Sequence, residues 1–227
     1  MINLVVNDLL DYDLKIFQDN NFFKFSLDSV MLAEFVRIDL KDKKLLDLCT
    51  GNAPLPLILA PKILHITAFE LQTEVFKLAL EGVKHNSVDN ITLINDNIKN
   101  IGNYFPGNNY DIVTCNPPYF KYSKNSIINE NREKAIARHE IEINLKEIVD
   151  IAYENLREKG KFYLVHRTNR LLEICSCLEE RGFGIKTIQF IYANETAECS
   201  MFLVESKKNT KSDIRVLNPI FTDRYRR

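Results

Sequence analysis

From residue 43 onward, short and almost continuously apolar runs alternate with segments of helical periodicity, and this alternation restricts the fold more than any other feature. The apolar runs cover residues 43–49, 65–71, 90–96, 110–116 and 161–167. A strand that is apolar along its whole length must be covered on both faces, which is typical of parallel sheets. Parallel neighbours also need a crossover segment between them. The pattern therefore predicts the α/β class.

The segments between these runs supply the expected helices. Residues 72–86 carry apolar side chains three or four positions apart, and residues 145–160 repeat the pattern up to Gly160. A further helix is expected from about residue 169 to the glycine at 182. Helical spacing of this kind indicates one buried face, and a glycine is the usual residue just beyond a helix end.

Two last strands, 184–193 and 198–206, are separated only by residues 194–196. So short a connection makes the two strands antiparallel neighbours. The predicted fold is a doubly wound, mostly parallel, seven-stranded sheet with one antiparallel strand. Such sheets bind their ligands outside the carboxyl ends of the strands.

The composition places the chain among ordinary globular proteins. Of its 227 residues, 45% are hydrophobic and 27% are charged, which excludes intrinsic disorder. No apolar stretch is long enough to span a bilayer, and the N-terminus carries acidic residues where a signal peptide would be basic. Five cysteines without repeated spacing suit a reducing compartment. We expect a cytoplasmic protein, with a main domain at 41–206 between a segment 1–40 and a basic tail 207–227.

The first strand ends in a turn of small residues that runs from Asp47 to Pro54 and contains Cys49 and Gly51. Such a turn lets a ligand approach the backbone closely. It is not a dinucleotide fingerprint, because Gly51 stands alone where G-x-G-x-x-G requires three glycines. It is not a phosphate loop either, because no Gly-Lys-Ser/Thr follows.

Acidic residues follow the next two strands. Glu70 lies about twenty residues beyond the turn, where a carboxylate accepts hydrogen bonds from the hydroxyls of a ribose. Asp96, followed by Asn97, ends the third strand, and its carboxylate can accept from an exocyclic adenine amine. At the ends of consecutive parallel strands these residues together predict a site for an adenosine moiety.

The fourth strand ends in the sequence Asn116-Pro117-Pro118-Tyr119, followed by Phe120. The prolines fix φ, so the carbonyl of Pro117 points in a defined direction. That carbonyl and the Asn116 amide oxygen are two acceptors suited to the two hydrogens of one amino group. The two aromatic rings can stack on a planar base.

At these residues the chain resembles the class I S-adenosylmethionine-dependent methyltransferases with an N-P-P-Y motif. Within that group it is most similar to the bacterial tRNA1(Val) (adenine-37) N6-methyltransferase family. The likeness covers nearly the whole chain, in the segments 23–32, 47–52, 114–120, 135–140 and 165–174. The N-P-P-Y motif is specific for methylation of an amino nitrogen, but it does not name the substrate.

The resemblance implies S-adenosyl-L-methionine as cofactor and assigns it several residues. The turn with Asp47, Cys49 and Gly51 would hold the methionine part, Glu70 the ribose, and Asp96 with Asn97 the adenine. Asp28, in the N-terminal segment, would help to cover the cofactor. The chain departs from the family's glycine-rich turn by having Cys49 and Ala53 where glycine is common.

The chemistry of an adenine amine defines what the motif must do. Its lone pair is delocalised into the ring, so acceptors at Asn116 and Pro117 would localise it and align it with the methyl group. The nitrogen becomes strongly acidic after attack, so we expect neither a dedicated general base nor a metal. Tyr119 would stack on the base once it has left its own stack.

The substrate is expected to be RNA, held beside this motif. The loop from Phe120 to His139 carries a local charge of +3, and the residues expected to contact the substrate are Pro118, Phe120, Lys121, Lys124, Arg138, His139 and Arg167. Adenosine-37 of valine tRNA is the leading substrate, with ribosomal RNA or DNA also open, because a fold does not name its polymer. The alternatives of another class are glutamine methylation in a translation factor and a non-catalytic RNA-binding module. The pI of about 6.4 adds no support for nonspecific RNA binding.

Overall fold

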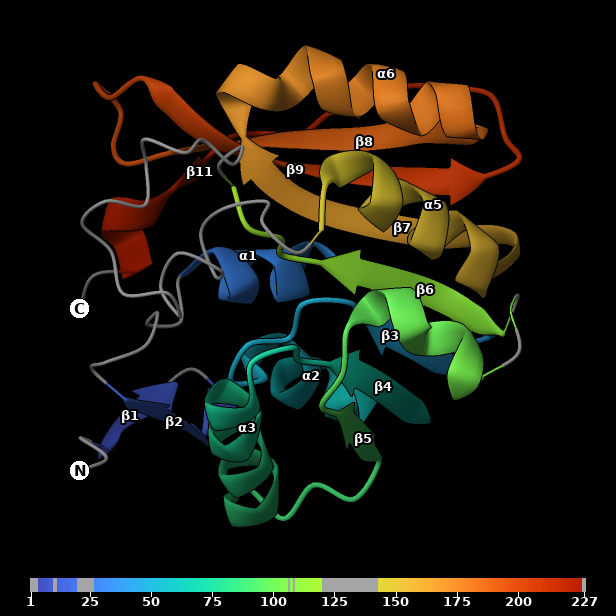
Figure 1. Ribbon diagram of the computed structural model, residues 1–227. Coiled ribbons are helices and arrows are strands. Elements are labelled where there is room, and N and C mark those ends of the chain that lie inside the picture. The colour runs from blue at the N-terminus through green and yellow to red at the C-terminus, as the bar shows by residue number, and fades with distance from the viewer. Residues whose placement is uncertain are drawn as a thin grey trace, which may run out of the picture.

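The computed structural model describes residues 4–9, 12–19, 27–105, 107, 109–119 and 143–225. A nine-stranded sheet runs through the molecule in the order β10-β8-β9-β7-β6-β3-β4-β5, with β11 also paired to β8 (Figure 1). Its long strands are β3 (Lys44–Asp47), β4 (His65–Phe69), β5 (Ile91–Ile94), β6 (Tyr110–Cys115), β7 (Leu156–Arg167), β8 (Phe183–Tyr192) and β9 (Cys199–Lys208).

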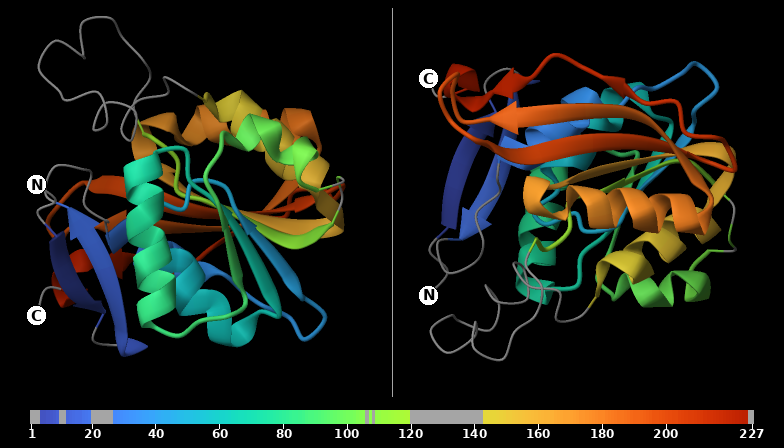
Figure 2. Two further views of the ribbon diagram at one scale, coloured as in Figure 1. Left: turned by 60° about the horizontal axis from the view of Figure 1, so that its bottom comes forward. Right: turned by 90° about the horizontal axis from the view of Figure 1, so that it is seen from above.

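Helices cover both faces of this sheet. One face carries α1 (Leu27–Phe35) and α2 (Pro54–Leu59), and the opposite face carries α5 (Leu145–Asn155), α6 (Leu171–Arg181) and the short helix η3 (Ile98–Asn103) (Figure 2). The helix α3 (Thr73–His85) packs beside β5. Single turns η2 (Ala60–Lys62), η5 (Thr168–Arg170) and η6 (Thr222–Tyr225) complete the chain. Within the described part, no helix is long and apolar enough to cross a membrane.

This arrangement confirms the predicted fold class. The seven expected strands all form, and β9 alone among them runs antiparallel to its neighbours, β7 and β8. The reason is the one that the sequence pattern gives: β6 is buried at all six positions because helices cover it on both sides. Two short strands, β10 (Arg215–Val216) and β11 (Ile220–Phe221), add to the seven.

The expected helix end at Gly160 is wrong. Helix α5 ends at Asn155, and β7 begins at the next residue. The strand register jumps between the pair Tyr110–Leu156 and the pair Ile112–Lys161, so residues 157–160 bulge out of the ladder. Lys159 lies at φ 58°, a left-handed conformation that no helix continues. Gly160 therefore belongs to the bulge, where the carbonyl of Arg157 would lie 2.9 Å from a Cβ atom.

The N-terminal segment forms a hairpin that sequence periodicity did not predict. Strands β1 (Leu4–Leu9) and β2 (Leu14–Asp19) pair with each other and lie beside α3 (Figure 1). The Asn86 side chain bridges α3 to Lys15 in both directions, accepting from its N–H at 2.9 Å and donating to its carbonyl at 2.8 Å. The Asn52 amide donates to the carbonyl of Phe17 at 2.9 Å, which ties the hairpin to the turn after β3.

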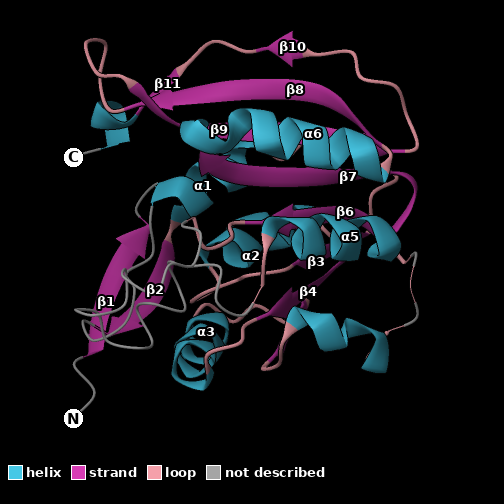
Figure 3. Cartoon of the chain, turned by 45° about the horizontal axis from the view of Figure 1, so that its top comes forward, coloured by secondary structure: helices cyan, strands magenta, loops and turns pink. Residues whose placement is uncertain are grey.

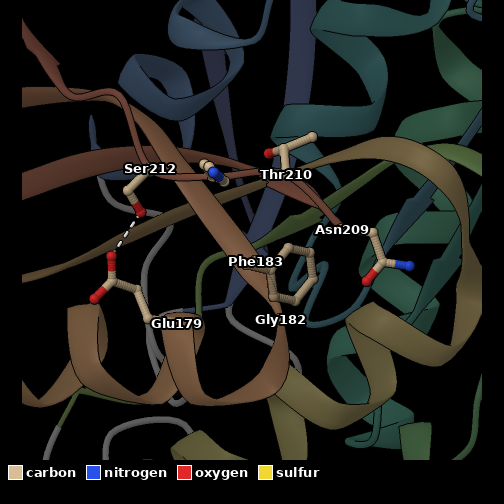
Figure 4. Close-up of a pocket in the computed structure, with 7 residues that line it drawn as sticks. Glu179, Gly182, Phe183, Asn209, Thr210 and Ser212 are labelled. Atoms are coloured by element: carbon tan, nitrogen blue, oxygen red, sulfur yellow. Dashed lines mark hydrogen bonds between the residues drawn. The ribbon is translucent and has the colours of Figure 1, made fainter.

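The residues after β9 turn back along the edge of the sheet instead of leaving it (Figure 3). The amide of Asp213 donates to the carbonyl of Ile185, and that of Leu217 to Ile188, each at 2.9 Å. A hollow of about 300 Å³ lies where this segment passes the end of α6, and there Ser212 donates to Glu179 at 2.6 Å (Figure 4). Two basic residues of the tail, Lys211 and Arg215, therefore border β8.

Gly184 tests how closely this segment must approach β8. A Cβ atom at this position would overlap the backbone oxygens of Thr210 and Lys211, which cannot move without losing the edge pairing. We expect Gly184→Ala to lower the free energy of unfolding by about 1–3 kcal/mol, the usual cost of overpacking. Chemical denaturation measures this value.

Gly102→Ala is the matched control, since a Cβ there meets nothing within 4 Å. It should change the free energy of unfolding by no more than about 0.5 kcal/mol. Equal stability of Gly184→Ala and wild type would show that the segment does not need this close approach.

Candidate active site

The turn after β3 is the floor of the candidate site. Gly51 lies at φ 59°, and a Cβ built on it meets no atom within 4 Å, so open space lies directly over its backbone. Ala53 is also left-handed, at φ 63°, and Pro54 then starts α2 at its first position. Left-handed alanine costs about 1–2 kcal/mol, which glycine would avoid. The departure from the glycine-rich pattern at Ala53 is therefore accommodated by backbone strain.

Asp47 joins the ends of the two central strands. Its carboxylate is buried and accepts a hydrogen bond from the Thr114 hydroxyl of β6 at 2.7 Å. Burial raises the pKa of Asp47 to about 6, although the hydrogen bond from Thr114 opposes the rise. The amide of Leu48 donates to the carbonyl of Thr114 at 3.0 Å, so the ends of β3 and β6 are held side by side.

Glu70, at the end of β4, closes the same turn from the other side. Its carboxylate accepts from the amide of Gly51 at 2.9 Å and from that of Gln72 at 2.8 Å. Burial raises the pKa of Glu70 to about 7, and these two N–H donors oppose the rise. Among the described residues, the Oε1 atom of Gln72 is buried without a hydrogen-bond partner. An unpaired buried acceptor beside a carboxylate suits a ligand that brings hydroxyl or amino donors.

Asp96, after β5, lies in a more open place. One carboxylate oxygen accepts from the amide of Asn97 at 2.7 Å and from the side chain of Asn100 at 2.8 Å, and the other accepts from the Tyr104 hydroxyl at 2.8 Å. The hydrogen bond from Asn100, then that from Tyr104, lowers the pKa of Asp96. Asn97 uses its side-chain oxygen to cap η3, accepting from Lys99 at 3.0 Å. Sequence analysis missed Asn100 and Tyr104, although their spacing of four and eight from Asp96 is a helical signal.

The N-P-P-Y segment meets the first turn of α1. The Asn116 side chain donates to the Ser29 hydroxyl at 2.8 Å, and its oxygen accepts from the Tyr119 hydroxyl at 2.5 Å. The same Tyr119 hydroxyl lies 2.9 Å from a carboxylate oxygen of Asp28. Pro117 is buried between them. Asp28 thus reaches this segment directly, and Ser29 is a site residue that sequence analysis missed.

His166 supports Tyr119 from β7. The two rings meet edge to face with their centroids 5.4 Å apart. Burial lowers the pKa of His166 to about 4, so the ring is neutral at physiological pH, and its Nδ1 accepts from the amide of Arg167 at 2.8 Å. Arg167 itself is exposed at the end of β7, and Pro118 is half-buried.

The remaining residues expected to contact the substrate lie outside the described residues. They are Phe120, Lys121, Lys124, Arg138 and His139. The residues expected to bind the cofactor and the N-P-P-Y segment thus follow the neighbouring strands β3, β4, β5 and β6, and Arg167 ends β7 beside β6.

A further hollow lies away from these strand ends. It has a volume of about 510 Å³ and is lined by Lys161, Glu205 and other charged residues near the amino edge of the sheet. Its buried groups are already paired: the Lys161 amine contacts Asp42 at 2.7 Å, and Thr187 donates to Glu205 at 3.0 Å. We therefore assign the candidate site to the carboxyl edge.

This fold, with Glu70 after β4, Asp96 after β5 and the N-P-P-Y segment after β6, defines a class I methyltransferase. The family model described as the methyltransferase small domain matches residues 22–190. The chain belongs to this family, and its cofactor is S-adenosyl-L-methionine.

Relatives and solved structures agree with this assignment. The chain is 26% identical over 201 residues to a tRNA1(Val) (adenine(37)-N6)-methyltransferase of Cytophaga hutchinsonii, covering 86% of this chain and 80% of the relative. It is 23% identical to a release factor glutamine methyltransferase of Fusobacterium nucleatum, covering 66% and 44%. The fold matches a predicted O-methyltransferase of Agrobacterium tumefaciens with a TM-score of 0.67 at 16% identity, covering 86% of this chain and 87% of the other. It also matches TYW2 of M. jannaschii in complex with AdoMet, with a TM-score of 0.60 at 14% identity and coverages of 91% and 86%.

The raised pKa of Glu70 gives a prediction for ligand binding. Only the carboxylate form has all its oxygens free to accept, so below pH 7 binding of a ribose must also release a proton. We expect the affinity for 5′-methylthioadenosine, which has no group that titrates between about pH 5 and pH 8, to rise by up to about tenfold per pH unit and to level off above about pH 7. Calorimetric titration across this range measures it.

Glu70→Gln should bind more weakly and lose most of this pH dependence, while Asp47 stays in place in both proteins. An affinity of the wild type that does not change between pH 5 and pH 8 would contradict the role of Glu70.

Proposed function

We propose that this methyltransferase acts in the cytoplasm and transfers a methyl group to the exocyclic N6 amine of adenosine in tRNA. Adenosine-37 of valine tRNA is the first candidate. The proposal is supported by relatives that carry this activity in their names. They are 24–26% identical to this chain and cover 79–86% of it. It is supported equally by the site, whose acceptors suit an amine.

The observation that carries the proposal is the position of Asn116. It follows directly on β6, and β6 pairs with β3, whose turn holds the open space over Gly51. We therefore expect an amide oxygen and the rigid carbonyl of Pro117 beside the turn after β3. Two acceptors beside a methyl donor suit a planar amine that must become pyramidal before it attacks.

The residues at the strand ends fit the cofactor by their chemistry. We propose that Asp47, Cys49 and Gly51 border its methionine part, that Glu70 accepts from the ribose hydroxyls, and that Asp96 with Asn97 borders the adenine. The bound cofactor supplies an electrophilic methyl group on a sulfonium centre with a good leaving group. Residues 1–40 cover this side of the site, a proposal that the contact between Asn52 and β2 supports.

The chain's own residues bind and orient the amine. Asn116 and Pro117 accept its two N–H groups and turn its lone pair toward the methyl group, while Tyr119 stacks on the extruded base. The neutral His166 ring behind Tyr119 limits the positions of that ring. Pro118, Arg167 and the basic segment 120–139, which lies outside the described residues, are the proposed contacts to the rest of the substrate.

Transfer of labelled methyl groups to unmodified total tRNA, followed by nucleoside analysis, tests the function. We expect labelled N6-methyladenosine with the wild type and a loss of about 100-fold or more with Asn116→Ala, because one lost acceptor in a preorganised site has an effect of this size. Affinity for 5′-methylthioadenosine should remain unchanged in this variant.

Asn194→Ala is the matched control, since Asn194 is an exposed residue of the β8–β9 hairpin whose side-chain oxygen accepts from the neighbouring Thr196. Label that appears in a purified release factor, with none in tRNA, would overturn the proposal in favour of glutamine methylation. Cofactor binding without labelled methyl groups in either tRNA or the release factor would contradict both tRNA methylation and glutamine methylation.

A further inference from the structure

The amide of Asn116 is held at both ends by other side chains. Its nitrogen donates to the Ser29 hydroxyl at 2.8 Å, and its oxygen accepts from the Tyr119 hydroxyl at 2.5 Å. An asparagine side chain presents donors on one end and an acceptor on the other, so its function depends on which end faces the amine. In the structure the Ser29 hydroxyl accepts from the N–H end and the Tyr119 hydroxyl donates to the oxygen end, and these two contacts together define the orientation.

The Tyr119 hydroxyl has one proton and two acceptors within reach. The Asn116 oxygen lies at 2.5 Å and the Asp28 carboxylate at 2.9 Å. Burial, and then the negative charge of Asp28, raise the pKa of Tyr119 well above its usual value, so the hydroxyl keeps its proton. Because one proton serves one strong hydrogen bond, Tyr119 donates either to Asn116 or to Asp28. The first state uses one of the two lone pairs of the Asn116 oxygen, and the second state leaves both lone pairs to the incoming amine.

Core packing fixes the helix that carries Asp28 and Ser29. The buried side chains of α1 are Val30, Met31, Leu32, Ala33 and Phe35. The Phe35 ring meets Tyr163 of β7 edge to face at 5.8 Å, and the amide of Arg37 donates to the Tyr163 hydroxyl at 3.2 Å. In the first turn itself, Val30 is part of the same core cluster and Leu27 packs against it, so the turn that carries Asp28 and Ser29 is anchored in the core.

We propose that the first turn of α1 sets the hydrogen-bond state of the catalytic asparagine. Ser29 takes the N–H end of Asn116, so that the oxygen faces the amine. Asp28 accepts the hydrogen bond of the Tyr119 hydroxyl when the amine arrives, so that the tyrosine does not compete for that oxygen. Both are positioning residues, and the exchange breaks one hydrogen bond and forms another without covalent change. This inference rests on the proposed function and adds to it.

Substitution of Ser29 tests the first part by steady-state kinetics on tRNA. We expect Ser29→Ala to lower kcat about 10- to 100-fold, as the loss of a supporting hydrogen bond does, with the affinity for 5′-methylthioadenosine within about twofold. Ser29→Thr keeps the hydroxyl and should recover most of kcat. Ser176→Ala, a serine of α6 that is exposed and far along the chain, is the matched control. Wild-type kcat in Ser29→Ala, or equal losses in the Ala and Thr variants, would overturn the role of Ser29.

A double-mutant cycle tests the second part. Asp28→Ala leaves the Tyr119 hydroxyl donating to the Asn116 oxygen, so we expect kcat/KM to fall about tenfold. In the Tyr119→Phe background there is no hydroxyl to withdraw, and Asp28→Ala should then have little further effect. Independent, additive losses from Asp28→Ala and Tyr119→Phe would show that Asp28 does not act through Tyr119.

A readout without any methyl acceptor separates this inference from the proposed function. In protein labelled with ¹⁵N-asparagine, the side-chain amide signal that disappears in Asn116→Ala identifies Asn116. Ser29→Ala should shift that signal and speed its exchange with water, whereas Ser176→Ala should leave it unchanged. An unaltered signal in Ser29→Ala overturns the network itself. A shifted signal in a protein that never methylates tRNA overturns the proposed function and leaves the network standing.

Discussion

Burial of the central parallel strands on both faces is the constraint on which the rest of the structure depends. Helices cover β3, β4, β6 and β7 from two sides, so the polar functions of these strands are confined to their ends. At the carboxyl edge the hydrogen bond between Asp47 and Thr114 joins β3 to β6. It thereby holds the turn after β3 beside the strand that ends at Asn116. A loop-built site would lack this fixed distance, because its residues would not share a sheet.

The depth at which each of three neighbouring carboxylates lies determines the direction of its pKa shift. Asp47 and Glu70 lie inside the edge, and burial raises the pKa of each, to about 6 and about 7. Asp96 lies further out, and hydrogen bonds from Asn100 and Tyr104 lower its pKa. The inner carboxylates therefore gain or lose their charge between about pH 5 and pH 8, whereas Asp96 is charged throughout this range. A cofactor with ribose hydroxyls and an adenine amine suits this gradient.

The N-terminal segment contributes more than a cover to this site. Asp28 and Ser29 come 91 and 87 positions before their partners Tyr119 and Asn116. Because α1 packs its apolar side chains against β7, its first turn has little freedom to move. Helix packing in the core is thus transmitted to the orientation of one amide group. In the proposed mechanism, that orientation decides which end of Asn116 faces the amine. The oxygen accepts from the N–H groups of the amine, whereas the NH₂ end would repel them.

The sequence by itself determined the order of strands and helices, the class of fold and the residues at the strand ends, because apolar period and turn composition are local properties. Only the tertiary structure decided that α5 ends at Asn155, that residues 215–221 pair with β8, and that Ser29 meets Asn116. These outcomes depend on contacts between distant segments. A serine in the first turn of a helix has the same local pattern whether it faces water or the amide of Asn116, and only packing decides between the two.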